Sequence, residues 1–305
     1  MTTYRQVGDP QGAGGAPGDI EHDRERHAAT SESGVLPFPT PVRGRRDGRR
    51  PPWALDADGG IHRQGHTVTV VLPALNEARN VGSVLDRIPS YVDEVVIVDG
   101  DSTDGTVDVA RSHRPDVVVT REPRRGKGLA LRAGFRAASG DVIVMLDADG
   151  SMAPEEIGRF LFLLAEGYQL VKGSRFLIGG GSSDITWMRR VGNHGLRLIV
   201  NTQYQTAMTD LCYGYCAFFT RDVRSLELTS DGFEIEAEIV TRALAKGLRV
   251  TEVPSFEKAR LSGRSNLRPF RDGGRILRVL ATDARPWSRR RPSSSAPTPK
   301  VGEPA

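Results

Sequence analysis

Cysteine is scarce in this sequence, with only Cys212 and Cys216 in 305 residues. Two thiols in a chain of this length cannot build a disulfide framework, which excludes the class of disulfide-bonded secreted scaffolds. We expect both side chains to be small buried apolar groups rather than a redox pair. A reducing, cytoplasmic compartment suits such a protein best.

Long apolar runs are absent as well. One of the longest, residues 160–165, is far shorter than the ~20 residues that a membrane-spanning helix needs. No charged, apolar and small-residue signal segment opens the chain. We therefore expect a soluble protein that is neither integral to a membrane nor secreted.

The body of the chain lacks an excess of charge. The formal net charge is +4, and residues 285–305 account for it, with five basic side chains against the single acid Glu303. Because duplex binding needs a basic face that neutralises several phosphates, the neutral remainder argues against nucleic acid as a partner.

Both ends of the chain also lack apolar periodicity. Residues 1–66 are rich in Gly, Pro, Ser, Asp and Arg, and such a segment cannot bury enough apolar surface to offset its ordering entropy. We expect a disordered tail over 1–66, one domain over 67–284, and a basic low-complexity tail over 285–305. The arginines within 43–50 are either a solvated linker or a contact for an anionic surface.

Between the tails, strand and helix patterns alternate. Apolar, β-branched runs predict strands at 68–72, 94–98, 117–119, 142–146 and 170–172, and the run 142–146 is the most apolar and so the most central. Helical patterns begin at Asn80 and cover 103–112, 127–138 and 155–166, the last opened by Pro154. The predicted fold class is α/β, a mostly parallel Rossmann-like sheet with helices on both faces, and such sheets bind ligands at the carboxyl ends of their strands.

Two polar loops follow the first two predicted strands, at 73–77 and 99–105. Neither region contains a Gly-x-Gly-x-x-Gly turn or a Walker lysine loop, so dinucleotide oxidoreductases and P-loop enzymes lose support. We expect Asp99 to contact a ribose or base, and Asp104 to cap a turn together with Ser102 and Thr103.

The fourth predicted strand ends in Asp147, Ala148, Asp149 and Gly150. Alternation directs both carboxylates the same way, and hard oxygen ligands so placed suit a divalent cation that is shared with a diphosphate. The alternative is that the two acids merely terminate the strand.

Residues 66–282 resemble family 2 glycosyltransferases of the GT-A fold, and among them the dolichyl-phosphate and polyprenyl-phosphate hexosyltransferases. The matching stretches are 73–77, 98–106, 126–128, 147–149, 173–175, 232–236, 252–254 and 260–265. The resemblance implies transfer of a hexose, with inversion, from a nucleotide-diphosphate sugar such as GDP-mannose or UDP-glucose, with Mg²⁺ or Mn²⁺. It also implies metal binding by Asp147 and Asp149, and donor binding by Pro73, Asn76, Glu77, Asp99, Asp101, Lys127, Asp147, Ala148, Arg260 and Ser265.

Two positions depart from the family's pattern. Ser151 and Met152 stand where the family usually has Gln or His, so a third protein ligand to the metal is not expected from that position. Asn266 replaces the usual lysine after the serine and removes one positive charge from the expected phosphate site.

The nature of the acceptor decides which further residues are needed. A phosphate acceptor is already an anion and needs only cations to hold it, for which Arg175, Arg189 and Arg190 are the candidates beside Arg260. A hydroxyl acceptor needs a positioned carboxylate, for which Asp210 comes first and Asp231 second. The alternative for Arg189 and Arg190 is that they are solvated surface arginines, and the alternative for Asp210 is a turn or cap before Leu211.

The resemblance and these residues together predict a metal-dependent inverting glycosyltransferase with Asp149, Arg260 and Asp210 as catalytic residues and a polyprenyl phosphate as acceptor. The alternatives are a hydroxyl acceptor on a small molecule or saccharide, or a sugar-nucleotide-binding module without turnover. For contact with the lipid we expect the apolar positions of 276–280, Arg275, Arg278, Trp287 and the arginines of 285–291 to touch an anionic membrane at its inner face. The alternative is that 276–280 packs on the domain.

Overall fold

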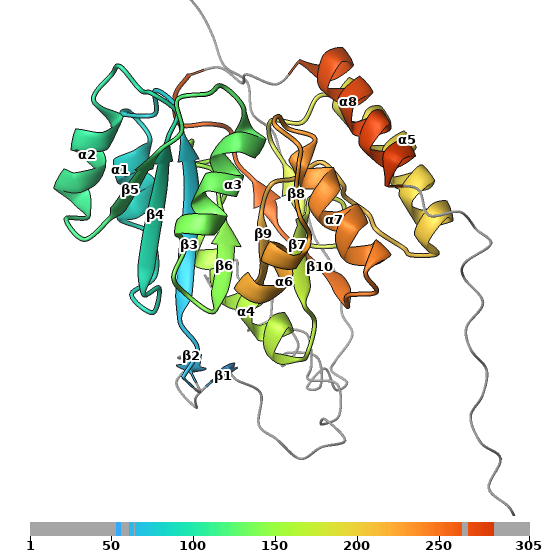
Figure 1. Cartoon of the computed structure of the whole chain (residues 1–305), viewed down its shortest axis with the longest axis horizontal. Coiled ribbons are helices and arrows are strands. Elements are labelled where there is room, and N and C mark those ends of the chain that lie inside the picture. Colours follow the sequence, from blue (N-terminus) through green and yellow to red (C-terminus); the bar gives the residue numbers. More distant parts are fainter. Residues whose placement is uncertain (1–52, 56–60, 64, 264–267, 284–305) are drawn as a thin grey trace, which may run out of the picture. The chain divides into compact units, whose positions relative to one another are not determined.

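The computed structural model describes residues 53–55, 61–63, 65–263 and 268–283 (Figure 1). The tail predicted over 285–305 and nearly all of the tail predicted over 1–66 lie outside these residues. Ser265 and Asn266 also lie outside them. Every structural statement below concerns the described residues.

A seven-stranded sheet forms the centre of the domain, in the order β10-β7-β9-β6-β3-β4-β5 (Figure 1). All neighbouring pairs are parallel except those that β9 makes with β6 and β7. Its strands are β3 (Val68–Ala74), β4 (Glu94–Asp99), β5 (Val118–Arg121), β6 (Val142–Met145), β7 (Leu170–Ser174), β9 (Cys216–Phe219) and β10 (Val250–Pro254). Two short pairs lie apart from it: β1 (Trp53–Leu55) with β2 (Ile61–Arg63), and β8 (Gly181–Ser182) with β11 (Phe256–Glu257).

Helices cover both faces of the sheet, as the sequence predicted. Alternate residues of the buried strands divide between two cores, because successive side chains of a strand point to opposite faces. One core includes α1 (Val81–Leu85), α2 (Thr106–His113) and α4 (Ile157–Ala165), which a 3₁₀ turn, η1 (Pro154–Glu156), precedes; the other includes α3 (Lys127–Ala137), α6 (Thr220–Ser225) and α7 (Ile235–Ala245). A third core joins α7 to α5 (Trp187–Tyr204) and α8 (Pro269–Thr282).

The five strands predicted from the sequence are present, and the very apolar β6 is the middle strand of the seven. The sequence reading did not include β9 or β10. Cys216 is buried on β9, Cys212 is half-buried, and both thiols are free. Burial raises the pKa of Cys212 to about 12 and that of Cys216 to about 11, which keeps both protonated and unreactive at neutral pH. Within the described residues, no helix combines the length and apolar character that a membrane span requires.

Candidate active site

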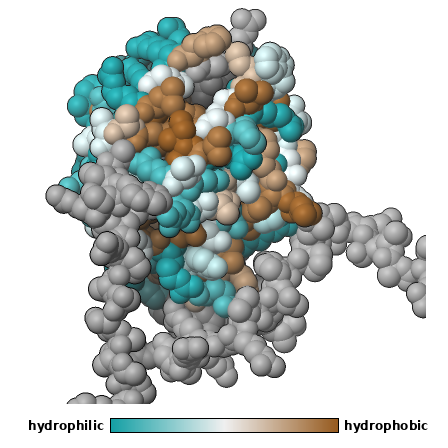
Figure 2. Space-filling model, turned by 90° about the vertical axis from the view of Figure 1, so that its right-hand side faces the viewer, coloured by the Kyte–Doolittle hydropathy of each residue, from teal (hydrophilic) through white to brown (hydrophobic). Residues whose placement is uncertain are grey.

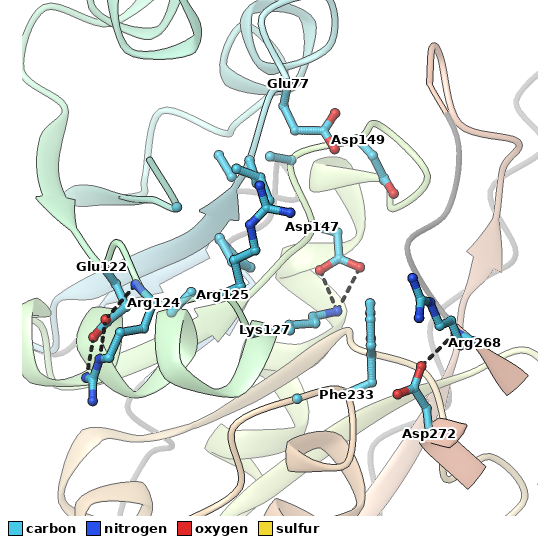
Figure 3. Close-up of a pocket in the computed structure, with 18 of the residues that line it drawn as sticks. Glu77, Glu122, Arg124, Arg125, Lys127, Asp147, Asp149, Phe233, Arg268 and Asp272 are labelled. Carbon is cyan, nitrogen blue, oxygen red and sulfur yellow. Dashed lines mark hydrogen bonds and ion pairs between the residues drawn. The ribbon is translucent and has the colours of Figure 1, made fainter. Parts of the chain in front are cut away.

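A cavity of about 430 Å³ opens at the carboxyl ends of β3, β4, β5 and β6 (Figure 3). Its lining comes from the loops after these four strands, from Phe233 before α7, from Arg260, and from the first two turns of α8. The residues are Pro73, Ala74, Leu75, Glu77, Gly100, Glu122, Arg124, Arg125, Gly126, Lys127, Ala130, Asp147, Ala148, Asp149, Gly232, Phe233, Arg260, Arg268, Arg271, Asp272 and Arg275.

Lys127, which lines this cavity, forms ion pairs with two acids. Its Nζ lies 2.7 Å from Asp147 Oδ1 and 2.7 Å from Glu236 Oε1, and 5.7 Å from the centre of the Phe233 ring. Burial opposes the charge of this lysine, but the two carboxylates outweigh it and hold the pKa of Lys127 above its ordinary value. Burial raises the pKa of Asp147 in spite of the attraction of Lys127. Gly214 leaves room for the ion pair of Lys127 and Glu236, because a Cβ at this position would lie 2.8 Å from both Lys127 Nζ and Glu236 Oε1.

Arg260 forms a second bridge across the cavity. Its guanidinium lies 2.8 Å from Asp149 Oδ2 and 3.5 Å from Glu77 Oε1. Asp149 is buried, and its Oδ1 accepts a 2.9 Å hydrogen bond from the backbone N–H of Ser151. Burial raises the pKa of Glu77 above its ordinary value, although Asn80 and Arg260 both oppose the shift. The two acids that end β6 therefore each contact a cationic side chain.

Three of the expected donor-binding residues hold loops together and do not line the cavity. The backbone N–H of Asn76 donates to Ser102 Oγ at 2.9 Å, which ties the loop after β3 to the loop after β4. Asp99 is buried and accepts from the backbone N–H of Ser102 at 3.2 Å. Asp101 pairs with Arg121. These contacts support the two loops whose other residues, such as Glu77, do reach the cavity.

Arg175 and Asp210 require a correction. Asp210 is fully buried, and its two carboxylate oxygens lie 2.7 and 3.0 Å from Arg175 Nε and Nη2. Arg175 also lies 3.1 Å from Glu257, and neither Arg175 nor Asp210 lines either of the two cavities of this site. The pair is enclosed by the domain, and removal of either partner would leave the other charge buried without compensation. Asp231, the second candidate base, is exposed and pairs with Arg132 at 2.7 Å.

The other two arginines that were candidates for the acceptor phosphate lie at the start of α5. Arg189 lines a small adjoining cavity of about 50 Å³ and lies 3.5 Å from Asp184. Arg190 is exposed, 5.9 Å from the centre of the Phe176 ring, and lines neither cavity. The structure therefore brings only Arg189 of this set near the site.

Asp147 and Asp149 fit a divalent cation that is shared with a substrate. Within the described residues no group of three or more His, Cys, Asp or Glu side chains is arranged to hold a metal ion. Mg²⁺ is commonly held by one or two carboxylates together with substrate phosphates, so two acids facing a cavity suffice. In the structure these carboxylates contact Lys127 and Arg260, so a bound cation would share them with two cationic side chains.

The sequence reading assigned several residues near this site no role in donor or acceptor binding, although it placed Arg275 at a membrane contact. Phe233 and Glu236 lie in a stretch that carried the family resemblance, but their contacts with Lys127 depend on folding distant segments together. Three arginines of the cavity could have been grouped from the sequence, because spacings of three and four residues place side chains on one face of a helix. They are Arg268, Arg271 and Arg275.

The sequence is similar to known glycosyltransferases. The model of the family described as glycosyl transferase family 2 matches residues 69–226. Glycosyltransferase AglJ of Haloferax volcanii is 34% identical over 219 residues, which are 70% of each chain. A dolichyl-phosphate hexose transferase of the same organism is 32% identical and matched over 68% of this chain and 90% of its own. A dolichol-phosphate mannosyltransferase of Pyrococcus furiosus is 31% identical, over 66% of this chain and 59% of its own.

Solved structures agree on the fold. Glucosyl-3-phosphoglycerate synthase from Mycobacterium tuberculosis, solved with Mn²⁺, UDP and phosphoglyceric acid, superposes with a TM-score of 0.57. It is 23% identical, and the match covers 72% of this chain and 79% of that one. The likeness extends to the mostly parallel sheet with its helices, the GT-A arrangement expected from the sequence.

Proposed function

This chain belongs to glycosyl transferase family 2, and from that membership we propose that it moves a hexose from a nucleotide-diphosphate sugar to a polyprenyl phosphate, with inversion. The observation that carries the proposal is the pair Asp147 and Asp149, which follows the central strand β6 and lines the cavity. Relatives named for dolichyl-phosphate hexose transfer and dolichol-phosphate mannosyl transfer support the acceptor.

The donor occupies the large cavity in this proposal. Pro73, Glu77 and Gly100 line the side that receives the nucleoside, and Arg260 lies beside the position of the diphosphate. A bound Mg²⁺ or Mn²⁺ at Asp147 and Asp149 supplies electrostatic stabilisation of the leaving diphosphate. Arg260 lies 2.8 Å from Asp149, and with a cation held by the two acids its guanidinium would be available to donate to a phosphate oxygen.

The acids around the site already have partners, which favours an acceptor that needs no general base. Eight acidic side chains of the described residues line the two cavities, and each already accepts a bond from a cationic side chain or a backbone N–H: Glu77, Glu122, Asp147, Asp149, Asp184, Glu236, Glu257 and Asp272. A phosphate nucleophile carries no proton that must be removed, so it needs none of them as a base.

A hydroxyl acceptor is the second candidate, and one observation favours it. The Asp184 side chain is 45% exposed and lines the small cavity, so it is the most accessible acid there. The two candidates differ in their response to Asp184→Asn. A hydroxyl acceptor predicts a large loss of kcat, whereas a phosphate acceptor predicts a rate close to that of the wild type.

The test is product analysis. Mass spectrometry follows reactions of GDP-mannose and UDP-glucose with a short polyprenyl phosphate, with Mn²⁺ or with EDTA. We expect a glycosyl phosphate product that EDTA abolishes, and a loss in kcat on the order of 10²-fold or more in Asp149→Ala. Asp108→Ala, an exposed acid on α2, is the control. Equal turnover in EDTA and Mn²⁺, or full activity in Asp149→Ala, contradicts the proposal, and binding of a sugar nucleotide without any product indicates a non-catalytic module.

We also propose that the face formed by α5 and α8 meets an anionic membrane, where a lipid acceptor resides. Trp187 and Phe270 are 76% and 86% exposed, and Val191, Leu198 and Leu277 are exposed beside them. Figure 2 shows hydrophobic side chains gathered on this side of the molecule. Arginines on the same two helices add attraction, each contributing about 1 kcal/mol near an anionic surface.

This surface overlaps in part with the one expected from the sequence, because Leu277 and the exposed Arg278 of α8 belong to both. Ile276 and Leu280 are buried against α5 and α7, so they pack on the domain and do not face a membrane. Trp287 and the arginines of 285–291 lie outside the described residues. In liposome sedimentation at low salt, Trp187→Ser combined with Phe270→Ser should weaken binding to anionic vesicles, and unchanged binding would count against this surface.

A further inference from the structure

Three arginines reach the large cavity without a carboxylate partner among the described residues. Arg125, Arg268 and Arg271 line the cavity and are exposed, and none of them forms an ion pair there. The other cations of the lining are paired: Lys127 with Asp147, Arg260 with Asp149, Arg124 with Glu122, and Arg275 with Glu234 at 3.9 Å. The unpaired three are therefore a distinct group within the lining.

The packing of α8 explains why its arginines face the cavity. Asp272, Ile276 and Leu280 are buried and recur every four residues, so they form the stripe that packs against the domain. Arg271 stands next to this buried stripe, and Arg268 is the extended residue that precedes the helix, and both line the cavity. The amino end of α8 adds partial positive charge at the same place.

The single acid of α8 that lines the cavity does not neutralise these arginines. Asp272 accepts a 2.7 Å hydrogen bond from the backbone N–H of Arg268, and it forms no ion pair with a described side chain. Figure 3 shows this contact and places Arg125 and Arg268 on either side of the Lys127–Asp147 pair. Positive charge thus converges on the cavity from two separate elements, the loop before α3 and the start of α8.

The ion pairs of the cavity show which cations are left to bind an anion. Seven cationic and five acidic side chains line the cavity, and two further acids outside the lining, Glu236 and Glu234, pair with Lys127 and Arg275. Arg125, Arg268 and Arg271 are therefore the lining cations that are available to donate to a phosphate oxygen, and the planar guanidinium fork matches phosphate oxygens.

We propose that Arg268 and Arg271, which lie together at the start of α8, form a phosphate subsite of the large cavity. The identification of phosphate as the bound group rests on the proposed function. Two sources share this chemistry, the diphosphate of the donor and the monophosphate of the acceptor. In either case the subsite holds a phosphate by charge and hydrogen bonding, without any acid or base of the cavity.

The test is direct binding by calorimetry with the full-length protein and Mg²⁺. UDP and GDP probe the donor source, and farnesyl phosphate and inorganic phosphate probe the acceptor source. The variants are Arg271→Gln and the double variant Arg268→Gln with Arg271→Gln. The matched control is Arg278→Gln, because Arg278 lies on the same helix, is exposed and does not line the cavity.

We expect Arg271→Gln to raise Kd about tenfold for one class of probe, the size of one lost charge-assisted hydrogen bond, and the double variant to raise it further. Weakened nucleotide binding alone identifies the donor source, and weakened binding of farnesyl phosphate and inorganic phosphate alone identifies the acceptor source. Arg271→Lys should recover part of the affinity. Affinities of Arg271→Gln and the double variant that equal those of Arg278→Gln for every probe would overturn the subsite.

This readout separates the subsite from the proposed function. A protein that yields no glycosyl product but shows arginine-dependent phosphate binding supports the subsite and contradicts the proposed function. A protein that forms the product while its arginine variants bind every probe normally supports the proposed function and overturns the subsite.

Discussion

Replacing Lys127 by Met removes the one ammonium group that Asp147 and Glu236 share. The side chains of Lys127 and Glu236 are each only 9% exposed, and that of Asp147 is 23% exposed. Removing one partner of a buried ion pair costs roughly 3–5 kcal/mol, because the remaining charge stays buried without compensation. Since Asp147 still reaches the cavity and its water, we expect a cost near the lower end, about 3 kcal/mol. For a domain of this size that lowers Tm by about 6–12 °C.

Thermal unfolding followed by circular dichroism measures this cost, first in EDTA and then with Mg²⁺ or Mn²⁺. Without the ammonium group, Asp147 meets an incoming divalent cation free of competition, so the metal should raise Tm more in Lys127→Met than in the wild type. Lys246→Met is the control, because Lys246 is exposed at the end of α7 and lies outside both cavities. Its Tm should stay close to that of the wild type.

Two results would refute this reasoning. A Tm of Lys127→Met in EDTA that equals the wild-type value means that the ion pairs do not stabilise the fold. Equal metal-induced shifts in the two proteins mean that Lys127 does not compete with a cation for Asp147.

Three further perturbations test other parts of the structure. Gly128→Ala should lower Tm sharply, because the added Cβ would lie 2.2 Å from a backbone carbonyl oxygen. Gly195→Ala on α5 has open space around it and should raise the free energy of unfolding by up to about 1 kcal/mol. Thermal unfolding that ranks the two variants the other way contradicts this packing. Arg124→Gln should raise the pKa of Glu122 from about 2 toward its ordinary value, because hydrogen bonds from Arg124 hold it low, and an NMR titration without that shift argues against the pair. Arg175→Lys should cost about 1–3 kcal/mol in unfolding free energy while leaving KM for the acceptor unchanged, since lysine cannot reproduce the fork; a raised KM with normal Tm would restore its acceptor role.

Local pattern was enough to predict the alternating strands and helices and the acids at the end of β6. Buried strands are continuous apolar runs and amphipathic helices repeat their apolar residues every three to four positions, so both can be recognised from neighbouring residues alone. β9 was missed because it is a short strand that pairs with β6 and β7 in the antiparallel sense, and sequence order does not give sheet order.

Site residues were harder to predict for a related reason. A polar residue after a strand either faces the cavity or meets a partner from a distant segment, and local spacing does not separate the two. Asp149 faces the cavity and meets Arg260, whereas Asp210 is enclosed with Arg175, which lies 35 residues away in the chain. Only the fold decides between these outcomes.

The position of β9 has a consequence for synthesis on the ribosome. The strands β3, β4, β5 and β6 can pair with one another as soon as they emerge, but the free edge of β6 waits for β9, about 70 residues later, which takes several seconds at the usual 5–20 residues per second. During that interval the most apolar strand of the protein presents unpaired backbone groups, the kind of edge that recruits other chains. A nascent chain stalled shortly after residue 170 should therefore bind chaperones or aggregate, and one stalled well beyond residue 219 should be protected from both.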